Sequence, residues 1–147
     1  MQPTTFNYTF SVVVPVYGCA ACLNELVTRI NATLTPLGHP FEIILINDAS
    51  PDDSARALHG LANAFAHVKV VSFSRNFGQH AAITAGIDFA SGEWVAVMDC
   101  DLQDQPEEIP KLYARALEGF DVVCARRHQR KDGLFKRFSS WIFLECI

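Results

Sequence analysis

Short apolar segments rich in Val, Ile and Phe alternate along this chain with longer segments of helical period. Strands that are apolar along their whole length, joined by helical crossovers of about a dozen residues or more, are typical of a parallel sheet with helices on both faces. The pattern predicts strands at residues 10–16, 41–47, 68–74, 93–98 and 120–125, and helices at residues 22–37, 51–65, 79–90 and 106–118. The sequence therefore predicts an α/β fold with a mostly parallel sheet.

The charge distribution divides the chain into two parts. Residues 1–125 carry 14 acidic and 6 basic side chains, and residues 126–147 carry 6 basic and 2 acidic ones, so net charges of −8 and +4 sum to −4. This mild negative charge argues against nucleic acid as a partner. We expect one domain over residues 1–125 and a basic appendage over residues 126–147. Because the chain ends inside an apolar segment, we also expect it to be truncated, with a missing C-terminal part.

Five cysteines, an odd number without a regular framework, occur at positions 19, 22, 100, 124 and 146. The N-terminus pairs no basic stretch with an apolar run, and no apolar stretch reaches the roughly 18 residues that span a bilayer. We therefore expect a cytosolic chain with reduced thiols. Cys19 and Cys22 have the spacing of half a zinc site, but the other cysteines supply no second pair. We interpret them as small apolar residues at the start of a helix.

Three oxygen-bearing side chains follow the strand predicted at residues 93–98. Asp99, Asp101 and Gln103 are two residues apart, so in extended chain they share one face. Parallel sheets bind ligands at the carboxyl ends of their strands, and oxygen ligands suit Mg²⁺ or Mn²⁺. The alternative is a pair of solvated acids at a strand end. We favour a metal site.

Asp48 follows the strand at residues 41–47 and is expected at the same edge of the sheet. Its carboxylate could accept a hydrogen bond from a ring N–H of a uracil or guanine. The alternative is a turn or helix-cap residue, but Ser50 and Pro51 already have the pattern of a helix start, which leaves Asp48 free. We favour the ligand role.

Four motifs cover most of the chain. Val-Val-Pro-Val-Tyr occupies residues 13–17, Asn-Asp-Ala-Ser 47–50, Ser-Arg-Asn-Phe-Gly 74–78, and Met-Asp-Cys-Asp-Leu-Gln-Asp-Gln-Pro-Glu 98–107. In these motifs the chain resembles family 2 glycosyltransferases of the GT-A fold, a Rossmann-like arrangement. Within that family it is similar to the polyprenyl-phosphate group typified by dolichol-phosphate mannosyltransferase. The last motif is the most specific.

The resemblance implies a site for a nucleoside-diphosphate sugar and a divalent metal, Mg²⁺ or Mn²⁺. It implies that the nucleotide sugar contacts Pro15, Val16, Tyr17, Asp48, Asn76, Gly78 and Asp99, and that the metal is held by Asp99, Asp101 and Gln103. Residues 18–22 depart from the family pattern, because Gly-Cys-Ala-Ala-Cys stands where relatives usually have Asn and Glu. This departure leaves the specificity for the base open.

The C-terminal appendage combines a basic cluster at residues 126–131 with an apparent amphipathic helix at residues 134–142. A basic collar beside aromatic and aliphatic residues is the pattern of a helix that lies in a membrane interface. The resemblance implies that Arg127 and Arg130 contact the phosphate of a lipid acceptor. The alternatives are a solvated loop, or a helix that packs on the rest of a longer protein.

These observations together predict a metal-dependent glycosyltransferase that moves a sugar from a nucleoside diphosphate to a polyprenyl phosphate, undecaprenyl or dolichyl. Asp99, Asp101 and Asp104 are the candidate catalytic residues, although Asp104 could instead cap a helix that starts at Pro106, with Glu107 completing a capping box. We expect it at the cytoplasmic side of a membrane, with this fragment soluble or peripheral.

Two other functions stay open: a transferase for a soluble or polysaccharide acceptor, and a donor-binding module without activity. A dinucleotide-binding oxidoreductase is disfavoured because no Gly-x-Gly-x-x-Gly follows the first strand. The oligomeric state is also open, a homo-oligomer included.

Overall fold

Alternating strands and helices make up the protein, whose structure is a computed structural model that describes residues 7–125. The elements are β1 (Tyr8–Val16), α1 (Ala20–Leu34), η1 (Thr35–Leu37), β2 (Phe41–Asn47), α2 (Ser54–Ala64), β3 (Val68–Ser72), α3 (Gln79–Phe89), β4 (Gly92–Val97), η2 (Pro106–Glu108) and α4 (Ile109–Ala116), where η marks a 3₁₀ helix. The first four predicted strands and all four helices are confirmed, with ends that shift by a few residues. None of the described helices is long and apolar enough to cross a membrane.

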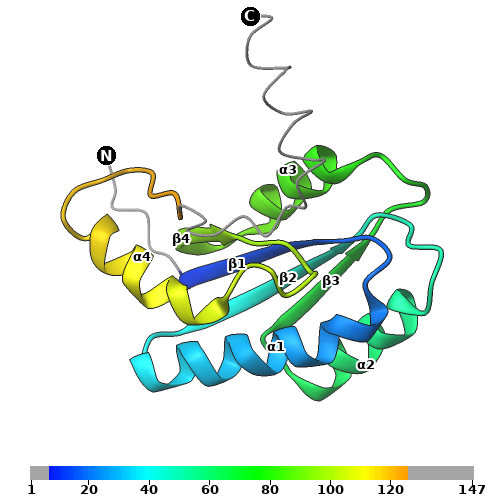
Figure 1. The fold of residues 1–147 in the computed structure, drawn as a ribbon, viewed down its shortest axis with the longest axis horizontal. Coiled ribbons are helices and arrows are strands. Elements are labelled where there is room, and N and C mark those ends of the chain that lie inside the picture. Colours follow the sequence, from blue (N-terminus) through cyan, green and yellow to red (C-terminus); the bar gives the residue numbers. More distant parts are fainter. Residues whose placement is uncertain (1–6, 126–147) are drawn as a thin grey trace, which may run out of the picture.

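The four strands form one parallel sheet in the order β3-β2-β1-β4 (Figure 1). The central strand β1 pairs with β2 on one side and with β4 on the other, so Val13 lies opposite both Ile44 and Val97. Because all strands run the same way, the carboxyl ends of β1, β2 and β4 meet at one edge. The chain turns there into the loops that carry the candidate residues.

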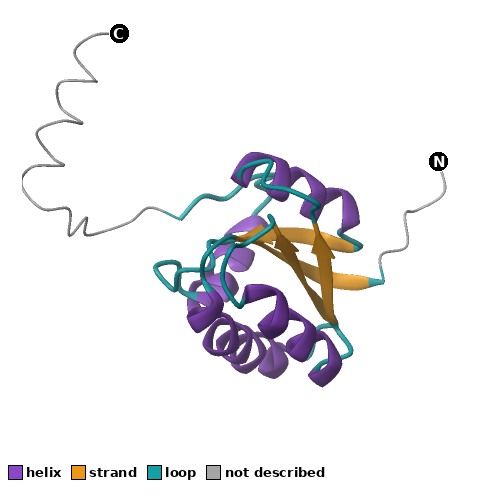
Figure 2. Cartoon of the chain, turned by 90° about the vertical axis from the view of Figure 1, so that its right-hand side faces the viewer, coloured by secondary structure: helices purple, strands orange, loops and turns teal. Residues whose placement is uncertain are grey.

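Helices cover both faces of the sheet, as predicted (Figure 2). On one face α1, α2 and η2 enclose the larger core, in which the five apolar side chains that α1 buries are all inaccessible to solvent: Leu23, Leu26, Val27, Ile30 and Leu34. On the other face α3 packs over a smaller core of Val13, Ile44, Ile46 and Ala82. The helical period of α1 thus places its apolar face on the sheet.

Two local predictions are wrong. Residues 120–125 form no strand, because they pair with none of the four strands, and β4 is therefore an edge of the described sheet. Phe120 and Val122 are accordingly exposed. Ser50 does not cap the second helix, which begins at Ser54 and follows Asp53.

Gly86 lets α3 approach the sheet closely. A Cβ built on Gly86 would overlap the side chain of Val13, which lies beneath it on β1. We expect Gly86→Ala to lower the free energy of unfolding by about 1–3 kcal/mol, because overpacking outweighs the better helix propensity of Ala. Urea denaturation followed by circular dichroism measures this change.

Gly60 provides the matched control, because it also lies inside a helix, α2, but has open space where its Cβ would stand. Gly60→Ala is expected to raise the free energy of unfolding by about 0.5–1 kcal/mol. Equal effects of the two substitutions would contradict the close-packing role of Gly86.

Candidate functional site

A cleft of about 330 Å³ opens at the edge of the sheet where β1, β2 and β4 end. Its lining comes from four separate segments and consists of Pro15, Val16, Tyr17, Asp48, Asn76, Gly78, Gln79, Asp99, Cys100 and Asp101. The sequence motifs at residues 13–17, 47–50, 74–78 and 98–107 therefore meet in one place. All seven residues predicted to contact a nucleotide sugar line this cleft, and so does Asp101.

The loop after β1 is fastened to the loop after β2. The N–H of Gly18, which adopts a left-handed φ of 69°, donates to Ser50 Oγ at 3.1 Å, and Ser50 Oγ–H donates to the carbonyl of Val16 at 3.3 Å. Ser50 therefore bridges two loops instead of capping a helix. This bridge holds Tyr17 at the cleft, with 54% of its surface exposed.

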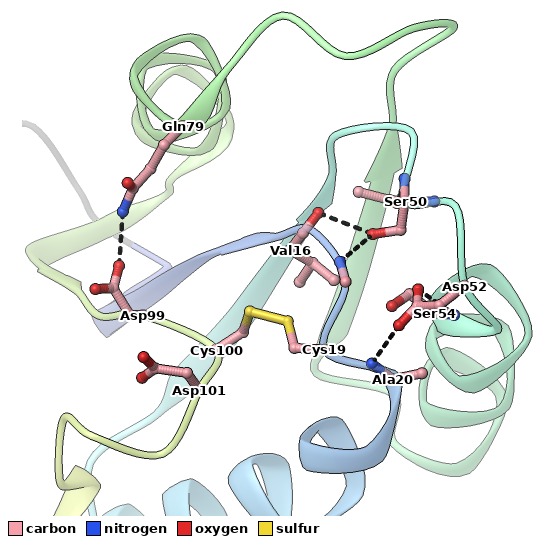
Figure 3. Close-up of a disulfide and its surroundings, with 12 residues drawn as sticks. Val16, Cys19, Ala20, Ser50, Asp52, Ser54, Gln79, Asp99, Cys100 and Asp101 are labelled. Atoms are coloured by element: carbon pink, nitrogen blue, oxygen red, sulfur yellow. Dashed lines mark hydrogen bonds between the residues drawn. A yellow bond between two sulfur atoms is a disulfide. The ribbon is translucent and has the colours of Figure 1, made fainter.

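Asp52, and not Ser50, supports the start of α2. Its carboxylate accepts hydrogen bonds from the N–H of Ser54 at 3.1 Å and from the N–H of Ala20 at 2.9 Å (Figure 3). It thus holds the first turns of α2 and α1 together. The hydrogen bonds from Ser54 and Ala20 lower the pKa of Asp52.

Asp48 anchors the loop that follows β3. Its two carboxylate oxygens accept hydrogen bonds from the N–H groups of Phe77 at 2.7 Å and Gly78 at 2.9 Å, and the residue is only 3% exposed. Asp48 was expected to be free for a ligand, whereas its carboxylate already supports the wall that carries Asn76 and Gly78. A carboxylate oxygen has a second lone pair, so a contact with a base stays a prediction.

Asp48→Asn tests this anchoring. The amide keeps one acceptor oxygen but turns an NH₂ group toward a backbone N–H, so one charge-assisted hydrogen bond is lost and a buried donor is left unpaired. We expect the free energy of unfolding to fall by about 1–3 kcal/mol. Chemical denaturation measures this loss, and Asp88→Asn, an exposed position on α3, is the control. Equal stability of the two variants would contradict the anchoring role.

Asp99 and Asp101 stand on a turn and not on extended chain. The strand ends at Val97, and Leu102 adopts a left-handed φ of 63°. As a result Asp101 Oδ1 accepts a hydrogen bond from the backbone N–H of Gln103 at 3.0 Å. The assumption of an extended chain is therefore wrong. Asp99 and Asp101 nevertheless both line the cleft, whereas Gln103 does not, and the metal role of all three stays a prediction.

Two neighbours orient Asp99. Its Oδ1 accepts a hydrogen bond from Gln79 Nε2 at 2.7 Å (Figure 3), and its backbone N–H donates to Asp104 Oδ2 at 3.0 Å. Asp104 therefore closes the turn and is not a helix cap, since η2 begins after Gln105 without a side-chain cap. Gln79 is a cleft residue that the sequence analysis missed. Its position as the first residue of α3, directly after Gly78, was the available signal.

Glu107 also has a different role from the capping box that was considered. Its carboxylate forms a two-pronged pair with Arg29 on α1, from Nε at 2.8 Å and from Nη2 at 2.7 Å. The hydrogen bonds from Arg29 lower the pKa of Glu107 to about 2. The pair stays charged at every pH at which the protein is expected to work, and it fixes η2 against α1.

The chemistry of the cleft fits a divalent cation that is shared with a phosphate ligand. Asp99 and Asp101 supply hard oxygen ligands, and no group of three or more His, Cys, Asp or Glu side chains within residues 7–125 is arranged as a metal cage. Mg²⁺ is usually held by one or two carboxylates together with substrate phosphates. The two carboxylates therefore suit an ion whose other ligands come from water and substrate.

The prediction that all thiols are reduced is wrong for two of the five cysteines. Cys19, in the loop after β1, and Cys100, between the two cleft carboxylates, form a disulfide whose Cα atoms are 6.3 Å apart (Figure 3). Cys22 and Cys124 are free. The pairing was missed because 81 positions separate the partners and only the fold brings them together. Arg127, Arg130 and the predicted amphipathic helix lie outside the described residues.

The chain is similar to named transferases over most of its length. The family model "Glycosyl transferase family 2" matches residues 11–145. The undecaprenyl-phosphate 4-deoxy-4-formamido-L-arabinose transferase of Klebsiella pneumoniae subsp. pneumoniae is 47% identical over 131 residues, which are 88% of this chain and 40% of that protein. A protein of the same name from Salmonella paratyphi A is 46% identical over 133 residues, 90% of this chain and 41% of that one. The chain thus spans about 40% of the length of these curated relatives.

Solved structures share the fold. The mannosyltransferase PcManGT from Pyrobaculum calidifontis, in complex with GDP-Man and Mn²⁺, matches with a TM-score of 0.63 at 22% identity, covering 84% of this chain and 37% of that one. TarS of S. aureus, in complex with UDP-GlcNAc, gives the same TM-score and identity, covering 84% and 38%. At this identity the likeness concerns the fold alone, which is the expected GT-A arrangement.

Proposed function

The chain belongs to glycosyl transferase family 2, and we propose that it carries the donor site of an enzyme that transfers a sugar from a nucleoside diphosphate to a polyprenyl phosphate. One observation carries this proposal. The cleft gathers Tyr17, the Asp48-anchored loop and the carboxylates of Asp99 and Asp101 at the carboxyl edge of a parallel sheet. The acceptor is proposed from the names of the relatives at 46–47% identity.

Each wall of the cleft suits one part of a nucleotide sugar. Pro15 and Tyr17 offer an apolar and aromatic surface for the base, next to Asp48. Asn76 and Gly78 lie on the loop that Asp48 holds. The side-chain amide of Asn76 and the unhindered backbone at Gly78 suit contacts with a ribose or a phosphate. The proposed ligand therefore runs from the loop after β1 toward the carboxylates after β4.

The departing nucleoside diphosphate accumulates negative charge as the bond to the sugar lengthens. A bound Mg²⁺ or Mn²⁺ would neutralise this charge as a Lewis acid. Asp99 and Asp101 are the residues that would hold the ion, and Gln79 keeps the Asp99 carboxylate aimed into the cleft through its hydrogen bond. Asp104 fixes the turn that carries both carboxylates, so its role is to position them.

The acceptor side of the reaction requires little from this part of the chain. A phosphate monoester is already anionic near neutral pH, so attack needs no strong general base. Arg127 and Arg130 are proposed to hold the lipid phosphate in charge-assisted hydrogen bonds. The basic composition of residues 126–147 supports a reaction at a membrane surface, and we propose its cytoplasmic side.

Calorimetric titration tests the donor site. UDP, GDP and their sugar conjugates are titrated into the folded chain with and without Mn²⁺. We expect binding that depends on the metal, with one base preferred over the other. Absence of nucleotide binding under every metal condition, in a chain whose circular dichroism shows a folded α/β protein, would contradict the donor site.

The acceptor needs a separate measurement of sugar transfer. Transfer of labelled sugar to undecaprenyl phosphate is compared with transfer to a soluble acceptor, and binding to anionic vesicles at low salt is measured in parallel. We expect transfer to the lipid phosphate and vesicle binding. Transfer to the soluble acceptor alone would reject the lipid acceptor while leaving the donor site intact.

A further inference from the structure

The Cys19–Cys100 disulfide joins the loop after β1 to the turn after β4, and both of these segments line the cleft. Cys19 follows Tyr17 and Gly18 in the loop after β1, whereas Cys100 lines the cleft between Asp99 and Asp101 (Figure 3). The bond therefore joins the segment proposed to hold the base to the segment proposed to hold the metal. These two segments follow the carboxyl ends of the neighbouring strands β1 and β4.

Each of the two joined loops is supported on its far side by other contacts. The loop after β1 is tied to the β2–α2 connection through Ser50 and through the hydrogen bond that the N–H of Ala20 donates to Asp52. The turn after β4 is tied to α3 through Gln79 and closed on itself by Asp104. The disulfide spans the boundary between these two groups of contacts, so it fixes the separation of the two walls of the cleft.

The sulfur atoms belong to the protein interior. Cys19 is 8% exposed and Cys100 is 9% exposed, and both belong to the larger core beside Val16 and Met98. When the bond is broken, two thiols cannot stay at bonding distance, so the turn with both carboxylates must move relative to the loop after β1. The well-packed core beneath them cannot absorb this change without a shift of the loops.

We propose that Cys19 and Cys100 form a redox-sensitive clamp that sets the affinity of the donor cleft. This proposal rests on the proposed function. A dithiol, such as a thioredoxin-class protein or dithiothreitol, transfers two electrons and two protons to the bond. The Cys19–Cys100 bond breaks, two thiols form, and the dithiol becomes a disulfide. A disulfide oxidant such as oxidised glutathione reverses the exchange.

The closed clamp favours donor binding because the loop that bears Tyr17 and the turn that bears Asp99 and Asp101 are already ordered relative to each other. Ligands bind more weakly when they must order loops themselves. Reduction is therefore expected to weaken nucleotide binding in the presence of Mn²⁺ about tenfold, the equivalent of about 1.4 kcal/mol. In a compartment with abundant thiol reductants the clamp would open, and the cleft would report the redox state.

The experiment compares oxidised and reduced protein. The chain is treated with oxidised glutathione, the Cys19–Cys100 linkage is checked by mass spectrometry of unreduced peptides, and the nucleotide that binds best is titrated with Mn²⁺ before and after dithiothreitol. Cys19→Ser is expected to bind about tenfold more weakly and to ignore dithiothreitol. Cys22→Ser is the matched control, because Cys22 is a free cysteine three positions away, and it should behave like the unmodified chain.

Each outcome decides one question. Equal affinity before and after reduction of a verified disulfide would reject the clamp and leave the donor site standing. Failure of oxidised glutathione to link Cys19 to Cys100 would also reject it. If no nucleotide binds in either state, the proposed function fails. The clamp is then tested by comparing backbone hydrogen exchange of residues 99–104 in the oxidised and the reduced protein. Faster exchange after reduction would support the clamp, and unchanged exchange would reject it.

Discussion

Asp101→Asn is expected to weaken metal-dependent nucleotide binding by about a hundredfold or more. The substitution replaces an anionic ligand with a neutral amide oxygen and leaves the size of the side chain unchanged. The affinity of a site for a divalent cation depends steeply on the number of its charged ligands, and about 1.4 kcal/mol corresponds to a factor of ten in affinity. Because the amide oxygen of Asn can still accept the hydrogen bond from the N–H of Gln103, the turn should keep its shape.

Calorimetric titration with Mn²⁺ measures the effect, and sugar-transfer activity should fall by a similar factor or more. Asp88→Asn removes the same charge from the exposed surface of α3, away from the cleft, and is expected to leave both quantities unchanged. The metal role of Asp101 would be refuted if Asp101→Asn bound nucleotide with the affinity of the Asp88→Asn control.

The sequence predicted the fold well where the pattern of apolar residues fits only one kind of element. Residues 41–47 were placed as a strand with the bounds that β2 has, because a run of Ile and Leu buried on both faces is hard to mistake. The apolar spacing in α1 was equally clear. The strand predicted at residues 120–125 was wrong because pairing depends on a neighbour that local sequence cannot supply. The side-chain bonds of Ser50 and Asp52 depend on the contact between two loops, which local sequence also does not reveal.

The sequence predicted which residues line the cleft better than it predicted the bonds between them. Strand ends in a parallel sheet must meet, so Tyr17, Asp48 and Asp99 were correctly grouped. The geometry of the turn after β4 was not predictable, because the left-handed backbone of Leu102 breaks the alternation of an extended chain. The partner of Cys100 was equally hidden, since a separation of 81 positions carries no local signal.

Glu42 is the feature that the sequence concealed most completely, because an acidic residue inside an apolar strand is easily read as a side chain that reaches solvent. Its side chain is fully buried on β2. Oε1 accepts hydrogen bonds from Ser11 Oγ at 2.6 Å and from the N–H of Ser91 at 2.7 Å, and Oε2 pairs with Lys69 Nζ at 2.5 Å. Burial raises the pKa of Glu42, but the bonds from Lys69, Ser11 and Ser91 outweigh it and hold the pKa below its ordinary value.

This network fixes the start of β4. Ser11 Oγ also accepts a hydrogen bond from the N–H of Gly92 at 2.8 Å, and a Cβ on Gly92 would lie 2.7 Å from the backbone of Phe10 and Ser11. The register of β4 against β1 is therefore set at this end of the strand. Asp99 and Asp101 follow the other end of the same strand, so the network also positions the carboxylates of the cleft.

Glu42→Gln is expected to lower the free energy of unfolding at neutral pH by about 1.5–3 kcal/mol, because the buried group loses the charge that strengthens its hydrogen bonds and its amide NH₂ group faces the half-exposed Lys69 ammonium. The exposed Glu93→Gln on β4 is the control and should change stability by less than about 0.5 kcal/mol. Urea denaturation of both variants measures the difference. A loss for Glu42→Gln no larger than that of the control would contradict the structural role of the buried carboxylate.

The pH dependence adds an independent check on Glu42. Because its folded pKa lies below the unfolded value of about 4.3, the unfolded chain binds more protons between the two values, and stability falls as the pH falls. The difference in free energy of unfolding between the unmodified chain and Glu42→Gln should reach its full size above the unfolded pKa of Glu42. It should shrink as the pH falls through the folded pKa. Glu107, with its pKa of about 2, titrates in both proteins and cancels in the comparison. A difference that stays constant with pH would show that the cost of Glu42→Gln comes from packing and not from the charge.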